Sequence, residues 1–351
     1  MSRNLLKSLL LPALLLFSVS CQKERNITRS FYYWKSSFKN NPAEQAMLQQ
    51  LGVKKLYMKF FDVQWDAKHL KPFPSAKIQF DSTALKQLKD SNIEIIPVIF
   101  ITNETISNII PESINKLGER VYFLLAGLLD DNLLTNIKEI QIDCDWTEST
   151  KDKYFDLLRY LKMLPKLLNK TLSATIRLYQ CKYLDKTGVP PVNKGMLMCY
   201  NMGNLKSPKT GNSILDPKEL EKYIGSLDSY PLPLDLALPL FEWNVLFRNN
   251  EYKGLINNLP DSLLQMQSFA TQKENRYVVS KDTIWNGYEF KLGDEIRKEQ
   301  TNFTELLDAV KLISPMWHTP EFNFSFYHLD STTLSKFSKN ELDSVYNSMR
   351  H

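Results

Sequence analysis

The chain has 351 residues, of which 43% are hydrophobic and 12% aromatic, enough for a packed core in one large domain or two small ones. The formal net charge of +5 is small for this length and gives no indication of nucleic-acid binding. The four histidines form no HExxH motif or other metal-ligand pair, and the four cysteines have no CxxC spacing. The sequence therefore indicates no metal site, no cofactor and no disulfide framework. Buried free thiols are expected at Cys144, Cys181 and Cys199, with one Cys181–Cys199 pair as the alternative.

The first twenty residues have the composition of a secretion signal. Arg3 and Lys7 precede an apolar run at 9–17, and small residues follow it. The run is far shorter than the roughly 20 residues that a membrane-spanning helix needs. We therefore expect residues 1–20 to be a cleaved signal peptide.

The end of this segment resembles the lipobox of bacterial lipoproteins, because a small residue directly precedes Cys21. Ser18 stands where that motif usually has Leu. The resemblance implies a lipid anchor at Cys21 in the bacterial outer membrane, with simple cleavage as the alternative. The charged residues 22–24 resemble the tag that directs some Bacteroidetes lipoproteins to the cell surface, so a periplasmic or a surface location is expected. Residues 21–29 are predicted to be a short tether.

Apolar runs and amphipathic stretches alternate along the rest of the chain. This alternation is typical of parallel β/α units. A doubly wound open sheet would be expected to carry a glycine-rich phosphate loop, and no GxGxxG or P-loop spacing occurs. The pattern therefore predicts an α/β fold, a (β/α)8 TIM-like barrel over 30–351. Its strands are expected at 30–34, 53–61, 93–101, 139–145, 172–178, 195–200, 234–239 and 322–328, and its helices at 42–51, 83–91, 113–134, 151–164, 217–227 and 302–312.

A long stretch separates the seventh strand from the eighth, and part of it has the signature of a β-hairpin. Asn286-Gly287 is a strong turn signal between two strand-like runs, 276–279 and 288–291. The sequence therefore predicts a hairpin insertion on the barrel rim at about 270–300.

The run 139–148 ends an apolar strand with several carboxylates. Side chains alternate across a strand, so Ile140 and Ile142 are expected on one face and Asp143 and Asp145 on the other. Acidic side chains are costly inside a sheet unless they meet a partner. Two of them at the end of a strand therefore indicate a functional opening, or else a buried polar network with Arg177 or Lys59.

Other polar and aromatic residues are predicted at the ends of barrel strands, where the loops of this fold form active sites. Aromatic rings cover the apolar faces of sugars, and polar groups bind the hydroxyls, so the set suits a glycan or oligosaccharide. Each ring could equally belong to the core, and His328 could be an ordinary rim residue. The residues expected to bind substrate are Trp34, Lys59, Arg177, Tyr179, Tyr200, Asn201, Trp243 and His328, with Asp62 noted beside Lys59.

Two of these strands resemble those of the chitinase-like glycoside hydrolases. The run IQIDCDW at 140–146 is similar to their DxxDxDxE strand, and MCYN at 198–201 to their Met-x-Tyr-Asp strand. The resemblance implies that Asp143 and Asp145 orient and tune the catalytic acid and that Tyr200 contacts an acetamido group of the substrate. The sequence departs from the pattern at its two ends: Ile140 replaces the first Asp, and Thr147 the catalytic Glu.

Further similarity, over most of residues 30–260, is to bacterial lipoproteins of unknown function with glycosidase-like barrels. Asn201 also replaces the family's Asp, and Glu148 stands one residue after the expected position of the acid. Glu148 is the nearest candidate acid, although a carboxylate there is also typical of a helix start. Glu242 is the alternative acid or nucleophile. Two functions remain open: a glycoside hydrolase, and a non-catalytic carbohydrate-binding or scaffold lipoprotein.

Overall fold

The computed structural model describes residues 24–350. The expected signal peptide and the lipidation site at Cys21 lie outside the described residues. The expected tether overlaps the first strand, which begins at Asn26. Within the described part of the chain, no helix combines the length and the apolar character needed to span a membrane.

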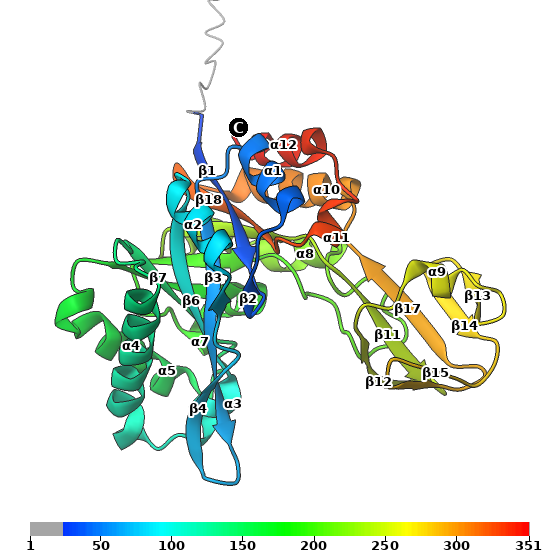
Figure 1. Ribbon diagram of the computed structural model, residues 1–351, viewed down its shortest axis with the longest axis horizontal. Helices are drawn as coiled ribbons and strands as arrows, with labels where there is room; N and C mark the ends of the chain where they lie inside the picture. Colours follow the sequence, from blue (N-terminus) through cyan, green and yellow to red (C-terminus); the bar gives the residue numbers. More distant parts are fainter. Residues whose placement is uncertain (1–23, 351) are drawn as a thin grey trace, which may run out of the picture.

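Eight parallel strands form a closed barrel, as predicted (Figure 1). The first strand pairs with both the last strand and the second strand of the barrel, and these two pairings close the sheet. The eight strands are β1 (Asn26–Tyr33), β3 (Lys55–Asp66), β6 (Glu94–Ile101), β7 (Glu139–Asp143), β8 (Thr171–Arg177), β9 (Lys194–Met198), β10 (Leu234–Pro239) and β18 (Glu321–Tyr327).

Helices connect the strands and cover the outside of the barrel (Figure 1). The main hydrophobic core lies between the two layers and includes Ile140 and Ile142 of β7. Several helix starts are capped by the residue types that favour them: Asn41, Asp81, Asp216 and Asn302. The helices are α1 (Pro42–Gln50), α2 (Ser82–Asp90), α3 (Asn103–Asn108), α4 (Ile114–Asp131), α5 (Lys151–Met163), α6 (Leu178–Lys182), α7 (Leu184–Thr187), α8 (Pro217–Ile224), α10 (Phe303–Ile313), α11 (Ser331–Leu334) and α12 (Lys339–Asn347).

The interior of the barrel is aromatic towards the carboxyl ends of the strands and charged towards their amino ends. Tyr32 and Tyr57 stack inside it, with ring centroids 5.0 Å apart. Near the amino ends, Lys194 Nζ lies 2.9 Å from Glu139 Oε2 and 2.7 Å from Asp235 Oδ2. Burial raises the pKa of Glu139, although the charge of Lys194 opposes this effect. The buried charges are therefore paired, as burial in a low-dielectric interior requires.

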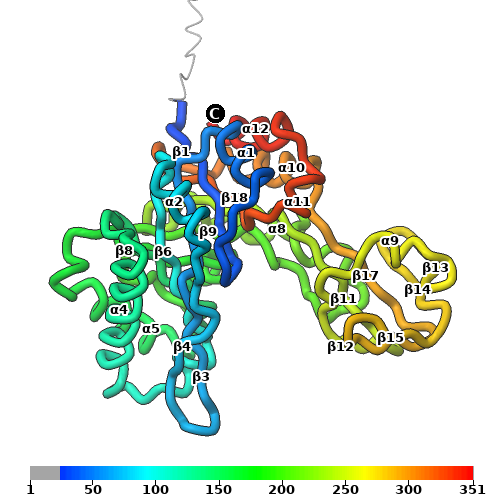
Figure 2. Tube along the Cα trace, in the orientation of Figure 1, coloured from blue at the N-terminus to red at the C-terminus, as the bar shows by residue number. Residues whose placement is uncertain are grey.

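The insertion between β10 and β18 is larger than the predicted 270–300 and begins at Glu242 (Figures 1 and 2). It is an antiparallel sheet in the order β12-β11-β17-β14-β13 with its own hydrophobic core. Its elements are β11 (Glu242–Arg248), β12 (Glu251–Ile256), α9 (Asp261–Leu264), β13 (Ala270–Lys273), β14 (Arg276–Val279), β15 (Thr283–Trp285), β16 (Tyr288–Phe290) and β17 (Glu295–Gln300).

The Asn286-Gly287 turn forms a hairpin, but its strands are β15 and β16. The predicted pairing of 276–279 with 288–291 was wrong, because β14 pairs with β13 and β17 instead. Asn286 and Gly287 both have positive φ, 46° and 81°, as a tight two-residue turn requires. The turn was predictable from two residues, whereas the pairing of β14 depends on contacts distant in sequence.

A buried ion pair attaches the insertion to the loop that follows β9. Arg297 and Glu299 of β17 are fully buried, and Arg297 Nε lies 2.5 Å from Glu299 Oε1. Arg297 also donates to the carbonyls of Leu205 and Ser207. Glu299 Oε2 accepts hydrogen bonds from the backbone and hydroxyl of Ser213. The pair therefore fixes both ends of the 205–213 segment to the insertion sheet.

A second extension projects from the barrel where the sequence analysis expected no strand after residue 61. β3 continues to Asp66 and forms an antiparallel hairpin with β4 (Lys71–Ser75). The short strands β2 (Ser37–Phe38) and β5 (Gln79–Phe80) pair beside it. Figure 1 shows this hairpin and the insertion as two arms that extend away from the end where the chain enters β1.

Candidate functional site

Asp143 ends β7 inside the carboxyl-end opening of the barrel, which we call the mouth. Its side chain points to the interior because it alternates with Ile142, which faces the outer core. Asp143 is 7% exposed, and its Oδ1 accepts a hydrogen bond of 2.5 Å from the hydroxyl of Thr175 on β8. The predicted orientation of the two faces of this strand is thus confirmed.

The environment of Asp143 favours its neutral form. Burial raises the pKa of Asp143 to about 7, and the nearby carboxylate of Asp145 acts in the same direction. The hydrogen bond from Thr175 and the charge of Arg177 lower the pKa and only partly offset these effects. Near neutral pH a substantial fraction of Asp143 therefore carries a proton that it can donate to a ligand.

Asp145 and Arg177 form an ion pair at the rim of the mouth. Arg177 Nη1 lies 2.7 Å from Asp145 Oδ2, and both side chains are partly exposed. Asp145 lies two residues after the end of β7, and Arg177 is the last residue of β8. These two strands are adjacent and parallel, so their carboxyl ends lie at the same edge of the barrel. The sequence left open that Asp143 and Asp145 pair with Arg177 or Lys59 in a polar network. Asp145 does pair with Arg177, whereas Asp143 forms no ion pair among residues 24–350.

A second ion pair, Lys59 with Asp62, lies on β3. Lys59 Nζ is 3.1 Å from Asp62 Oδ1 and 3.2 Å from Oδ2, although only Oδ2 receives a well-directed hydrogen bond. The register of β3 against β6 shifts between Lys59 and Phe61, which is a β-bulge. The bulge brings Asp62 to the same face as Lys59, although simple alternation would separate them. Lys59 Nζ also lies 5.5 Å from the ring centroid of Trp34.

Aromatic rings from four strand ends contact one another in the mouth. Tyr327 is central to them: its ring centroid lies 5.1 Å from that of Tyr200, 5.4 Å from Trp34 and 5.7 Å from Phe241. Phe241 in turn contacts Trp243 at 5.2 Å. Burial raises the pKa of Tyr327 most, and the charges of Asp143, Asp62 and Asp145 raise it further, so the rings and the carboxylates share one region. We call the rings of Trp34, Tyr200, Phe241, Trp243 and Tyr327 the aromatic cluster.

Sequence reasoning overlooked Tyr327 and Phe241, whereas it noted Asp62 beside Lys59 among the residues at strand ends. Tyr327 stands directly before His328, the residue that was chosen at the end of this strand. Phe241 lies two residues after the end of the seventh strand and precedes Glu242. In both cases the position at a strand end was the available signal, and sequence reasoning preferred the neighbouring residue for its polar side chain.

The two candidate acids outside β7 do not join Asp143. Glu148 is exposed just before α5, and it makes no hydrogen bond or ion pair within residues 24–350. Glu242 lies on β11 of the insertion, where its Oε2 is 2.5 Å from Lys336 Nζ. The sequence predicted Glu242 at the end of the seventh barrel strand. Neither β11 nor the ion pair with Lys336 was predicted.

Two of the expected binding residues, Tyr179 and Asn201, have other surroundings, and a third, His328, contacts the aromatic cluster as a partly buried neutral ring. Tyr179 is 50% exposed, and its ring packs on that of Tyr183 at 4.7 Å. Asn201 is exposed with φ of 54°, and its backbone N–H donates to Ile214. His328 contacts Tyr327 with ring centroids 5.4 Å apart, and burial lowers its pKa to about 4, so it is neutral at pH 7. No group of acidic, histidine or cysteine side chains suited to a metal ion occurs within 24–350.

The sequence matches no protein-family model and no curated protein. Solved structures of similar fold include a chitinase from Chromobacterium violaceum, with a TM-score of 0.57 and 9% identity over 93% of this chain and 99% of that one. The Bacillus cereus spore cortex-lytic enzyme SleL gives 0.54 and 10%, over 94% and 75%. A mutant catalytic domain of the Group II chitinase of Ostrinia furnacalis, in complex with penta-N-acetylchitooctaose, gives 0.54 and 11%, over 92% and 95%. The chain thus has the fold of the chitinase-like TIM barrels, to which its similarity in sequence is distant.

Proposed function

We propose that this protein binds an N-acetylhexosamine-containing glycan at the mouth of the barrel and does not hydrolyse it. The observation that carries the proposal is the convergence of Asp143, the Asp145–Arg177 ion pair and the aromatic cluster at one end of the barrel. Rings beside fixed polar groups suit the alternating apolar and hydroxylated faces of a sugar. The Ostrinia furnacalis chitinase domain, which has a similar fold, was solved in complex with penta-N-acetylchitooctaose, and this supports an N-acetylated glycan as the ligand.

The mouth offers complementary groups to one N-acetylated sugar. Asp143 can donate a hydrogen bond to the acetamido oxygen when it is protonated, and accept one from the acetamido N–H when it is ionised. The Asp145–Arg177 pair presents further donors and acceptors at the rim. Tyr200 and Tyr327 lie beside Asp143 and supply apolar ring surface. Lys59 and Arg177, the two cations described at the mouth, are both paired with carboxylates, which disfavours an anionic sugar.

The argument against hydrolysis rests on residues 147 and 148. Thr147 occupies the position where the resemblance places a catalytic Glu, and its hydroxyl hydrogen-bonds to Ser149 and Thr150. A threonine hydroxyl is far too weak an acid to protonate a leaving glycosidic oxygen. Glu148 is exposed and lacks any partner that would orient it, within the part of the chain that the structure describes. The two positions nearest to the family's general acid therefore supply no oriented acid, which supports binding without hydrolysis.

A second candidate is glycoside hydrolysis with Asp143 as the acid. One observation favours it: a pKa of about 7 is well matched to proton donation near neutral pH. Asp62 supplies a second carboxylate close enough to raise the pKa of Asp143. In this case the proton of Asp143 would pass to the leaving oxygen, and a water molecule or the acetamido group of the sugar would attack the anomeric carbon.

A glycan-array screen followed by product analysis tests the two candidates. The purified protein should bind N-acetylated chitooligosaccharides, and mass spectrometry after prolonged incubation should detect no shorter products. The Glu148→Gln variant should bind as the wild type does. Product release that is lost in Asp143→Asn would support hydrolysis by Asp143, whereas product release lost in Glu148→Gln would contradict the structural argument for this residue. An array without any bound glycan would refute both.

We also propose that Cys21 carries a lipid that anchors the protein in the outer membrane of a bacterium. The segment of small residues that ends at Cys21 supports this proposal. Metabolic labelling with an alkyne fatty acid should modify the full chain and fail to modify Cys21→Ser. Equal labelling of the two chains would refute the anchor.

A further inference from the structure

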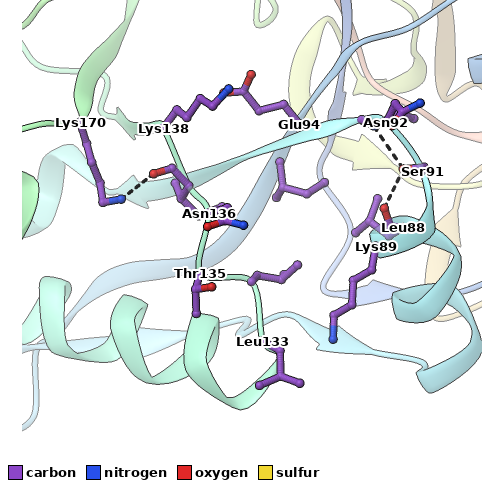
Figure 3. Close-up of a pocket in the computed structure, with 14 residues that line it drawn as sticks. Leu88, Lys89, Ser91, Asn92, Glu94, Leu133, Thr135, Asn136, Lys138 and Lys170 are labelled. Atoms are coloured by element: carbon purple, nitrogen blue, oxygen red, sulfur yellow. Dashed lines mark hydrogen bonds between the residues drawn. The ribbon is translucent and has the colours of Figure 1, made fainter.

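A cavity of about 990 Å³ opens at the amino-terminal end of the barrel, opposite the mouth. It is lined by the loops before β6 and β7 and by Lys170, which directly precedes β8. Figure 3 shows Lys89, Lys138 and Lys170 on three different elements around this cavity. The proposed glycan site uses none of these residues.

The cavity presents more positive than negative charge. Its lining contains three lysines and a single carboxylate, Glu94, which lies 3.9 Å from Lys55. Lys170 Nζ is held over the cavity by a 2.5 Å hydrogen bond to the carbonyl of Ile137. Neither Lys89 nor Lys138 has a carboxylate within ion-pair distance among residues 24–350. Exposed acids do occur at the nearby helix ends, Asp90, Asp130 and Asp131, so the excess of positive charge is confined to the cavity lining.

Large apolar side chains project beside these lysines. Leu133 lines the cavity and is 74% exposed, with a φ of 53° that is unfavourable for leucine. Leu168, two residues before Lys170, is 63% exposed. Lysines with protruding leucines are the composition of surfaces that lie against anionic bilayers, where the ammonium groups meet phosphates and the apolar tips enter the interface.

The chain enters the barrel at this same end. Ser30 of β1 pairs with Lys55, and Lys55 pairs with Glu94, so the start of β1 at Asn26 lies at the end that carries the cavity. Cys21 is five residues before Asn26. Five residues of extended chain span at most about 17 Å. A lipid on Cys21 would therefore keep the bilayer within reach of this face of the barrel.

We propose that the amino-terminal face, defined by Lys89, Lys138, Lys170, Leu133 and Leu168, docks on a bilayer surface that contains anionic phospholipids. The proposal rests on the lipid anchor at Cys21, and it adds an electrostatic contact that fixes the orientation of the barrel. In this orientation the glycan-binding mouth points away from the membrane.

Vesicle co-sedimentation with the chain from Gln22 onward tests the face without the anchor, because residues 24–350 hold the whole barrel and insertion. The protein should bind vesicles of phosphatidylglycerol and phosphatidylcholine. Salt at 0.5 M should abolish this binding, because it shortens the range of the attraction between lysines and lipid phosphates to a few ångströms. The triple variant Lys89→Gln, Lys138→Gln, Lys170→Gln should bind about tenfold or more weakly. The matched control Lys68→Gln, Lys71→Gln, Lys77→Gln changes the net charge equally near the mouth and should bind normally.

Each alternative result overturns the proposal. Equal binding to pure phosphatidylcholine vesicles would mean that anionic lipid is not recognised. Equal loss in both triple variants would mean that only net charge matters. Competition by millimolar inorganic phosphate would indicate a small-anion site in the cavity and no bilayer contact. Fatty-acid labelling of the full chain reports on the anchor separately, so a failure of the anchor and a failure of the face are distinguishable.

Discussion

The substitution Glu299→Gln should destabilise the insertion strongly, because it removes one partner of a fully buried ion pair. Arg297 and Glu299 have no exposed side-chain surface, and the distance from Nε to Oε1 is 2.5 Å. Without the carboxylate, the guanidinium remains buried over the ring of Phe247 with neutral acceptors only, the carbonyls of Leu205 and Ser207 and the introduced amide, and with no counter-charge. Loss of one partner of a buried pair typically costs about 3 to 5 kcal/mol. We expect a loss of that size in the free energy of unfolding.

Urea denaturation followed by tryptophan fluorescence measures this loss, because the indole of Trp243 donates to Glu299 Oε2 at 2.7 Å. The matched control is Glu251→Gln, which removes a carboxylate from an ion pair with Lys253 in which the Glu251 side chain is 74% exposed. Water screens a pair of exposed side chains, which therefore contributes little to stability, so the control should unfold as the wild type does. A Glu299→Gln variant as stable as this control would refute the reasoning about the buried pair.

Three further predictions concern the barrel. The pKa of Asp143 is raised to about 7, so the folded protein binds its proton more tightly than the unfolded chain does, and the stability from this residue is present at acidic pH and lost as the pH rises from about 4 through 7. Asp143→Asn should lack that loss in melting curves measured across this range. Profiles of melting temperature against pH that run parallel in the variant and the wild type would contradict the raised pKa. Tyr327→Ala should weaken binding of an N-acetylated chitooligosaccharide by roughly tenfold in calorimetry, whereas Tyr179→Ala, which removes a half-exposed ring, should not. Lys194→Met leaves Glu139 and Asp235 buried without their shared cation and should cost about 3 kcal/mol in urea unfolding, and an unchanged midpoint would contradict the assigned network.

The barrel was predictable because its signals are local. Each strand is a short apolar run, and the helices that separate the strands begin at capping residues such as Asp81 and Asp216. The alternation of Ile142 with Asp143 can be read from adjacent residues. The insertion was predicted too small because β11 pairs with β17, about fifty residues later in the chain. The carboxylate of Glu242 therefore belongs to an antiparallel sheet, and it pairs with Lys336 from the far end of the sequence.

The site was predictable to the extent that it follows strand ends. Asp143, Asp145, Arg177, Lys59, Trp34 and Tyr200 were placed by this rule, and the structure brings them into one region. Asp62 was noted beside Lys59, but their ion pair was not predicted, because the β-bulge in β3 that brings both side chains to one face has no pattern in the sequence. That the six residues at the strand ends bind a glycan stays a prediction.

The central claim is that the mouth binds an N-acetylated glycan and leaves it intact. The most direct measurement is a calorimetric titration of the protein with an N-acetylated chitooligosaccharide, with mass spectrometry of the recovered ligand. We predict saturable binding that is lost or strongly weakened in Tyr327→Ala, with the oligosaccharide recovered at its original length. Absence of binding, or recovery of shortened products from the wild type, would contradict the claim.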